Sequence, residues 1–197
     1  MNGFHIKSCT EGDYEPVLEL LKQLWPDSEL NYETLKAVYI KALNSDTQKY
    51  IVGLVDDKII GFCSLTIKNN LWQAGNLGHI DELIVDKNFR ERGYGKKLMD
   101  EITHIAKQNG CKRIELDSAF HREEAHRFYE NQGYYNRAYL FSKEICTNMN
   151  TESKEYNSLK ETEYIMSSPE MLSRIKEAQQ EIEESKGIVI DIDDLWE

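Results

Sequence analysis

The order of apolar and polar residues predicts strands and helices that alternate along residues 1–145. Strands are indicated where apolar residues recur at every second position or form short runs, and helices where they recur at three- and four-residue spacing. The predicted strands cover residues 4–9, 48–55, 59–67, 78–86, 112–119 and 138–145, and the predicted helices cover residues 11–25, 31–44, 94–110 and 122–134. This succession favours an α/β fold in which helices pack on a mixed sheet.

Local signals support several of these boundaries. Asp13 is a candidate N-cap of the first helix, and Pro26 ends it. A short Asp56-Asp57-Lys58 connection predicts a hairpin, and Asn109-Gly110 is typical of a helix end. The residues expected to face the core are Val17, Leu20, Leu21 and Leu24 in the first helix, Leu35, Val38, Tyr39 and Leu43 in the second, and Leu98, Ile102, Ile105 and Ala106 in the third.

The composition changes after Ile145. Residues 146–158 are polar and small, as in a linker, and two amphipathic segments follow at 154–166 and 168–187. We therefore predict two domains, an α/β domain at residues 1–146 and a linker with a mainly helical extension at residues 147–197. About fifty residues of this kind bury little apolar surface alone, so their apolar stripes need another surface.

Charge and composition restrict the class of protein. The total charge is −11; residues 148–197 hold 13 acidic and 5 basic residues, a net of −8, so residues 1–147 carry −3. This balance argues against nucleic acid as a direct ligand and favours cationic substrates or a basic partner.

No apolar run is long enough to cross a membrane and the first residues show no secretory signal, so a cytoplasmic location is expected. The four cysteines are far apart and predict neither a disulfide framework nor a metal site.

A local basic segment stands out against this acidic background. Residues 86–98 read DKNFRERGYGKKL, with Gly93 and Gly95 between arginines and lysines, after a predicted strand and at the start of a predicted helix. Glycines allow a ligand to approach the backbone, and the free N–H groups of a helix N-terminus favour an anion. The spacing fits neither a P-loop nor a dinucleotide fingerprint. The segment alone is equally typical of a basic, solvated turn.

Together with AHRFYENQGY at residues 125–134, this segment resembles the GNAT superfamily of N-acetyltransferases. The resemblance covers most of residues 2–145 and implies a splayed central sheet, acetyl-CoA as co-substrate and no metal. It implies that the backbone of Arg90, Glu91, Arg92, Gly93, Tyr94, Gly95 and Lys96 binds the pyrophosphate, and that the main chain of Leu83, Ile84 and Val85 pairs with the pantetheine arm. Tyr129 would protonate the departing thiolate; without the resemblance, a core aromatic residue on an amphipathic helix is the favoured interpretation of this position. The chain departs from the family pattern at Lys87, where many members have proline, and at Arg122, where many have an asparagine that helps to hold the cofactor.

Acetyl transfer to an amine also needs a group that accepts a proton. Asp81 and Glu82 come just before the predicted pantetheine contacts. As neighbours in a strand they should point to opposite faces, so that at most one faces the acceptor amine. The resemblance favours Asp81 over Glu82 as the base. The alternative for both is a structural salt bridge.

Several segments are similar to the aminoglycoside 6′-N-acetyltransferases: LWPDSE at residues 24–29, ELDSA at 115–119 and YLFSKEI at 139–145. This similarity implies that Asp117 binds amines of the acceptor. Carboxylates of Asp27, Glu29, Asp81 and Asp117 around a cleft would attract an aminoglycoside or a polyamine. A protein N-terminus or lysine is the alternative acceptor, since fold-level similarity does not identify it.

Residues 155–197 resemble a different family, the toxin-binding half of Phd/YefM-type antitoxins. That resemblance implies a partner like the basic RelE/YoeB ribonuclease toxins, bound through residues 150–197. The alternative is packing on the chain's own first domain or on a second copy, which would make a homodimer.

Two classes of function follow from these observations. The first is an acetyl-CoA-dependent N-acetyltransferase. The second is an antitoxin-type interaction protein whose GNAT-like domain is a scaffold. The intact glycine loop and Tyr129 favour the enzyme. A toxin that acetylates charged tRNA would need a basic surface, which a first domain of charge −3 does not favour.

Overall fold

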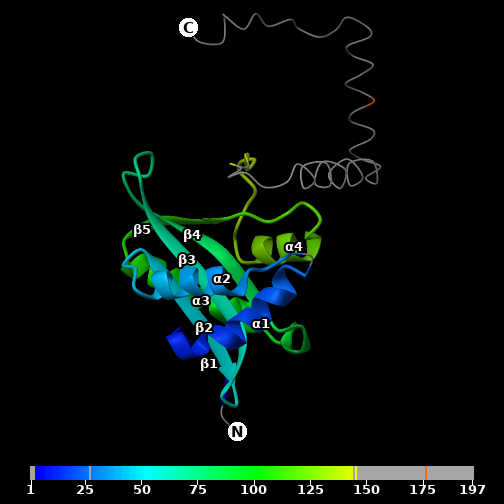
Figure 1. Cartoon of the computed structure of the whole chain (residues 1–197). Helices are drawn as coiled ribbons and strands as arrows, with labels where there is room; N and C mark the ends of the chain where they lie inside the picture. The colour runs from blue at the N-terminus through cyan, green and yellow to red at the C-terminus, as the bar shows by residue number, and fades with distance from the viewer. Residues whose placement is uncertain (1–2, 27, 144, 146–175, 177–197) are drawn as a thin grey trace, which may run out of the picture. The chain divides into compact units, whose positions relative to one another are not determined.

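The structure is a computed structural model of the 197-residue chain, and it describes residues 3–26, 28–143, 145 and 176. The chain divides into two units, residues 1–138 and 139–197, whereas the composition predicted a boundary after residue 146. The strands and helices named below lie in the first unit (Figure 1). The predicted linker, the toxin-binding segment and Asp27 fall outside the described residues, apart from Lys176.

The first unit is a five-stranded sheet with helices on both faces (Figure 1). The elements are β1 (His5–Ser8), α1 (Tyr14–Leu24), α2 (Tyr32–Leu43), β2 (Gln48–Val55), β3 (Lys58–Asn70), β4 (Gly75–Val85), α3 (Tyr94–Gln108), β5 (Cys111–Leu116) and α4 (Glu123–Asn131), with short 3-10 helices η1 (Glu11–Asp13) and η2 (Lys87–Phe89). Strands β1 to β4 are antiparallel neighbours, and β5 runs parallel to β4 after the crossover through α3. The predicted mixed α/β sheet is confirmed.

Two apolar cores cover the two faces of the sheet. One joins α1 and α2 to β2, β3 and β4, and includes Val17, Leu20, Leu21, Tyr39, Phe62 and Ile84. The other joins α3 to the opposite face and includes Cys63, Leu65, Ile80, Leu98, Ile102 and Ala106. Most of the predicted inward positions are therefore confirmed. Val38 is an exception, since its side chain is exposed and the buried residues of α2 are Tyr39 and Ala42.

Some local predictions hold and others fail. Asp56 and Asp57 both adopt left-handed backbone angles, as a two-residue hairpin requires, and Gly110 does so after α3. Asp13 makes no cap bond to α1; its carboxylate instead binds Lys7 and the backbone N–H of Thr10.

The predicted strand at residues 138–145 is wrong for its described residues. Residues 138–143 and 145 form no strand, and Tyr139, Leu140, Phe141 and Ile145 are exposed. An apolar run becomes a strand only where a neighbouring strand satisfies its backbone groups. The described sheet ends at β5 instead.

Two irregularities of β4 shape the site. The pairing with β3 shifts between Cys63, opposite Leu83, and Leu65, opposite Ile80, so β4 holds one extra residue in a β-bulge. The parallel pairing with β5 ends at Ile80. Beyond Ile80, β4 continues to Val85 with no described strand on its β5 side, which is the splay that the resemblance implied.

None of the described helices is long and apolar enough to cross a membrane.

Candidate active site

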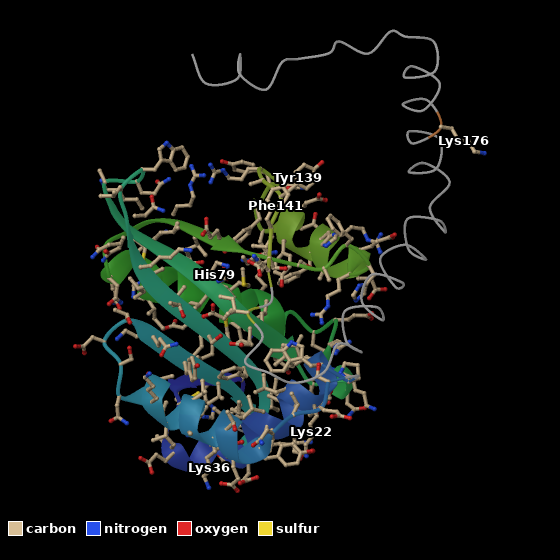
Figure 2. All side chains as sticks on the ribbon, turned by 45° about the horizontal axis from the view of Figure 1, so that its top comes forward. Lys22, Lys36, His79, Tyr139, Phe141 and Lys176 are labelled. Carbon is tan, nitrogen blue, oxygen red and sulfur yellow. The ribbon has the colours of Figure 1, made fainter. Side chains whose placement is uncertain are left out.

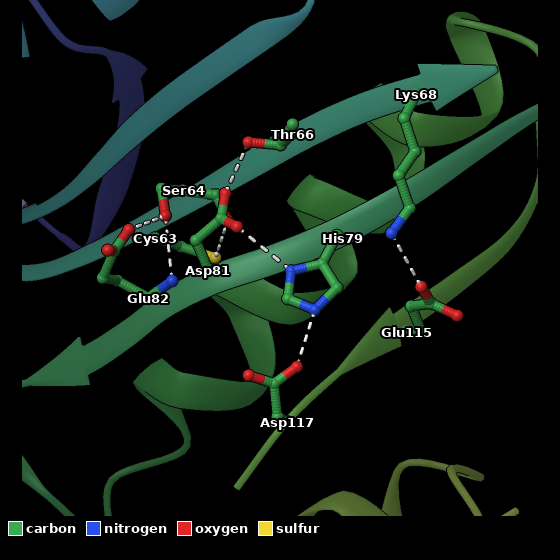
Figure 3. Close-up of polar contacts among 9 residues, drawn as sticks. All are labelled: Cys63, Ser64, Thr66, Lys68, His79, Asp81, Glu82, Glu115 and Asp117. Carbon is green, nitrogen blue, oxygen red and sulfur yellow. Dashed lines mark hydrogen bonds and ion pairs between the residues drawn. The ribbon is translucent and has the colours of Figure 1, made fainter. Parts of the chain in front are cut away.

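Polar side chains from three adjacent strands meet on one face of the sheet (Figure 3). They come from β3 (Ser64, Thr66, Lys68), from β4 (His79, Asp81, Glu82) and from β5 and the residue that follows it (Glu115, Asp117). The two predicted base candidates and the predicted substrate residue Asp117 therefore lie in one cluster. It adjoins the end of β4 that β5 leaves open.

The prediction that Asp81 and Glu82 point to opposite faces is wrong. Thr66 Oγ1 donates to Asp81 Oδ2 at 2.6 Å, and the Ser64 hydroxyl donates to Glu82 Oε2. Ser64 and Thr66 are two residues apart on β3 and share a face, so both carboxylates lie on that face. The β-bulge explains this, because its extra residue lets two successive side chains of β4 oppose Ser64.

Glu82 is the more buried of the two carboxylates. Its backbone N–H donates to Ser64 Oγ at 2.9 Å, while the same hydroxyl contacts its carboxylate. Burial raises the pKa of Glu82, an effect that the Ser64 hydrogen bond opposes and the nearby Asp81 charge reinforces. A carboxylate with a raised pKa is a stronger proton acceptor than an unperturbed glutamate.

Asp81 has both oxygens engaged, one by Thr66 and the other by His79 Nδ1 at 3.0 Å. Burial alone would raise the pKa of Asp81, but the hydrogen bonds from His79 and Thr66 outweigh it and lower the pKa. His79 Nε2 also lies 2.7 Å from Asp117 Oδ1, so one imidazole links β4 to the end of β5. Asp81 is therefore held as an ionised carboxylate, which makes it a weaker base than Glu82.

The nearby helices place two of their cations on aromatic rings. Lys22 of α1 lies over the Tyr32 ring, and Lys36 of α2 lies over the Tyr14 ring. Figure 2 labels both lysines. Glu29, between α1 and α2, is exposed.

The predicted pantetheine residues lie on the open stretch of β4. Leu83 and Val85 pack in the core beside α3, and Ile84 is buried against α1 and α2, so their backbone is what a ligand along this edge would contact. The Val85 carbonyl accepts a hydrogen bond of 3.1 Å from Arg90 Nε. That contact places the first arginine of the basic segment at the end of β4.

The predicted pyrophosphate loop leads into α3. Glu91 and Gly93 have positive φ angles of 60° and 77°, and Gly93 precedes the first residue of the helix. A side chain at Gly93 would meet no atom within 4 Å, so the space over its backbone is open. The first N–H groups of α3 have no intrahelical acceptor and suit an anion there. Lys96 pairs with Asp100 at 2.9 Å.

Several side chains that the sequence analysis did not identify hold the residues leading into this loop. The buried Asp86 carboxylate accepts from Asn88 N at 2.9 Å, which lowers the pKa of Asp86. Gln23 of α1 donates to Asp86 and accepts from the backbone N–H of Lys87 at 3.1 Å. Proline has no N–H to donate, so lysine at this position adds a bond between the loop and α1.

Helix α4, which carries Tyr129, packs against the start of α3. A side chain at Gly95 would lie 3.4 Å from Phe128 of α4 and 3.9 Å from Val85, so loop, strand and helix meet there. The Tyr129 ring packs on Phe128 and Tyr134, and burial raises the pKa of its hydroxyl. Arg122 donates to the Leu24 carbonyl at 3.0 Å, so this residue, where many relatives carry a cofactor-binding asparagine, ties α4 to the end of α1.

The geometry can be compared with known proteins. A model of the acetyltransferase (GNAT) family matches residues 14–134, a span that contains the cluster, the open edge of β4, the glycine loop and Tyr129. The chain belongs to the GNAT acetyltransferase family. This assignment confirms the predicted family and class of enzyme.

Relatives and solved structures agree with this family. The chain is 29% identical over 136 residues to an aminoalkylphosphonate N-acetyltransferase of Salmonella typhimurium, covering 69% of this chain and 85% of that protein. A solved glucosamine-6-phosphate N-acetyltransferase of Arabidopsis thaliana superposes with a TM-score of 0.63 at 27% identity, covering 74% of this chain and all of that one. An aminoglycoside N-acetyltransferase, AAC(6′)-Iy, solved with CoA, superposes with a TM-score of 0.66 at 20% identity over 74% and 97% of the two chains and shows the shared fold. GNAT acetyltransferases use acetyl-CoA.

The structure thus brings Asp81, Glu82 and Asp117 together beside the open edge of β4, with the glycine loop and Tyr129 at its far end. Sequence reasoning missed His79, Ser64 and Thr66. The sequence does show that His79 lies two residues from Asp81 on the same strand and that Ser64 and Thr66 alternate along another strand. This alternation does not show which residues of neighbouring strands lie opposite them.

Proposed function

We propose that this GNAT enzyme transfers an acetyl group from acetyl-CoA to a primary amine of a small cationic acceptor, such as a polyamine or an aminoglycoside. The observation that supports this acceptor is the excess of carboxylates beside the open edge of β4. Four carboxylates share that face with His79 and Lys68, and Lys68 is paired with Glu115 at 3.2 Å. Charges of one sign gathered on one face favour a ligand of the opposite sign.

The residues present fit acetyl-CoA. The backbone of Leu83 to Val85 lies along a strand edge that no described strand covers, and Arg90 to Lys96 offer backbone N–H groups and open space over Gly93. The co-substrate supplies the activated acetyl group as a thioester. The chain's own residues orient it and handle the two protons of the reaction.

Glu82 is the group we assign as the base. An acceptor amine is protonated in water and must lose a proton before it can attack a thioester. Glu82 combines a raised pKa with a place on the acceptor face, whereas Asp81 is kept ionised by two hydrogen bonds. Glu82 therefore takes the proton directly or through one water, and Asp81 and Asp117 bind the acceptor's charge.

Tyr129 is the group we assign as the acid. The raised pKa of its hydroxyl keeps it protonated over the working range, so it has a proton to give to the departing thiolate. Its ring packs on Phe128, and Phe128 lies next to Gly95, so the contacts of α4 with the start of α3 help to hold the Tyr129 ring in place.

The test is release of CoA from acetyl-CoA in the presence of a panel of amines. We expect spermidine and an aminoglycoside to be acetylated with a higher kcat/KM than glucosamine 6-phosphate, aminoethylphosphonate or an N-terminal peptide. The phosphate-bearing amines test the acceptor classes named for the relatives. Faster turnover of those anions would contradict the cationic acceptor but leave the acetyltransfer reaction in place.

On the sequence resemblance alone, we also propose that residues 150–197 bind a basic toxin similar to RelE/YoeB. Their net charge of about −8 suits a basic, RNA-binding partner. Co-expression with such a toxin should yield a complex with the full chain and none with a chain ending at residue 145. Equal recovery with both chains would contradict the assignment.

A further inference from the structure

His79 contacts two carboxylates at once, one through each ring nitrogen. Nδ1 lies 3.0 Å from Asp81 Oδ1, and Nε2 lies 2.7 Å from Asp117 Oδ1 (Figure 3). A neutral imidazole has a single N–H and can donate to only one of them, leaving a lone pair against the other carboxylate. An imidazolium donates to both. The geometry therefore fits the protonated ring.

The charges around His79 favour the same form. The charged groups that share its face are Asp81 and Glu82 on β4, Asp117 after β5, and the paired Lys68 and Glu115 on β3 and β5. Hydrogen bonding to Asp81, and then to Asp117, raises the pKa of His79 although burial opposes it. The ring is thus a cation supplied by the protein itself, placed between two carboxylates.

The two carboxylates differ in how firmly they are held. Asp81 is bound through both oxygens, and its side chain is 35% exposed. Asp117 is 48% exposed, and only its Oδ1 contacts a partner within the described part of the chain. A cation from solvent can reach Asp117 without breaking other contacts, and it then shares the carboxylate with His79.

We propose that protonated His79 competes with a second ammonium group of the acceptor for Asp117 and Asp81, so that binding of a polycationic acceptor releases a proton from His79. This inference rests on the proposed function in that it takes this face as the acceptor site. The released proton passes to solvent, and no covalent bond other than the N–H changes. The ring returns to the imidazolium form when the acceptor leaves.

Thermodynamic linkage fixes the sign of the pH dependence. Two like charges next to one another disfavour each other, so a bound ammonium lowers the pKa of His79 and, reciprocally, a proton on His79 weakens binding of the ammonium. Since the pKa of His79 in the free protein is raised, the affinity for a polycation increases as pH rises through that value and is lowest below it. A monoamine that does not reach Asp117 shows no such dependence.

The test combines calorimetry and NMR on the full chain with spermidine as the probe. Titrations from about pH 6 to about pH 7.5 in two buffers of different ionisation enthalpy should show net proton release, in a range where the amines of spermidine stay protonated. In the free protein the imidazole of His79 should titrate at a higher pH than an unperturbed histidine, with both nitrogens protonated below that pH. Saturation with spermidine should move that titration to lower pH.

Two variants test the roles of His79 and Asp117 separately. His79→Asn should bind spermidine about tenfold more tightly than wild type near pH 6 and release fewer protons on binding, since it removes the competing charge while Glu82, whose pKa is also raised, stays on the same face. Asp117→Asn should lower the pKa of His79 and weaken spermidine binding. The proposal is overturned if spermidine binds without proton release, if His79 in the free protein titrates no higher than an unperturbed histidine, or if spermidine fails to bind even near pH 8. The last result, with CoA still released to a monoamine, would leave the acetyltransfer reaction standing.

Discussion

Glu82→Gln is expected to lower kcat by about 100-fold or more while acetyl-CoA affinity stays within about twofold. The substitution keeps the shape of the side chain and the contact to Ser64 but removes the group that accepts the amine's proton. Because Glu82 must be ionised to act and its pKa is raised, wild-type activity should rise with pH through that pKa. The variant should lose this acidic limb of the kcat profile.

Two matched variants separate this role from its alternatives. Asp81→Asn should raise the KM of a polycationic acceptor more than it lowers kcat and should keep the acidic limb. Tyr129→Phe should lower kcat by about tenfold or more and remove the alkaline limb, since Tyr129 acts only while protonated. An acidic limb that disappears in Asp81→Asn and persists in Glu82→Gln would assign the base to Asp81.

Gly93→Val is expected to weaken acetyl-CoA binding by about 100-fold, which corresponds to about 2.7 kcal/mol. Gly93 lies at the start of α3 with φ 77° and open space above it, the place where we put the pyrophosphate. A valine there fills that space and disfavours the left-handed backbone. Calorimetry with acetyl-CoA measures the loss.

Gly110→Val is the control for this substitution. Gly110 has nearly the same φ of 71° and the same open surroundings, but it follows the other end of α3. Both variants should lose a similar stability, of about 1–2 kcal/mol, because both force valine into the left-handed region. A parallel fall in acetyl-CoA affinity in both would mean that backbone strain, and not blocked approach, explains the effect.

Most of the fold could be predicted from the sequence, because each element carries its own periodicity. The hairpin at Asp56-Asp57 and the end of α3 at Gly110 follow from local turn chemistry. The strand expected at residues 138–145 failed, since a strand also depends on a partner that the local pattern does not show. The prediction that Val38 is buried failed for a related reason. Helical spacing alone does not determine how wide the buried face of a helix is.

The candidate site was predicted in part. The resemblance pointed to the glycine loop, β4 and Tyr129 because their motifs are local. The shared face of Asp81 and Glu82 was missed, because the β-bulge that places them there depends on pairing with Ser64 across the sheet. His79 was missed for the same reason, since its partner Asp117 is 38 residues away along the chain.

The most direct test of the central claim is a calorimetric titration of the full chain with acetyl-CoA. An acetyltransferase with an open β4 edge and a working glycine loop should bind it saturably, at a single site on each chain. A folded chain that gives no binding, with its melting temperature unchanged by acetyl-CoA, would contradict the account and make the GNAT domain a scaffold.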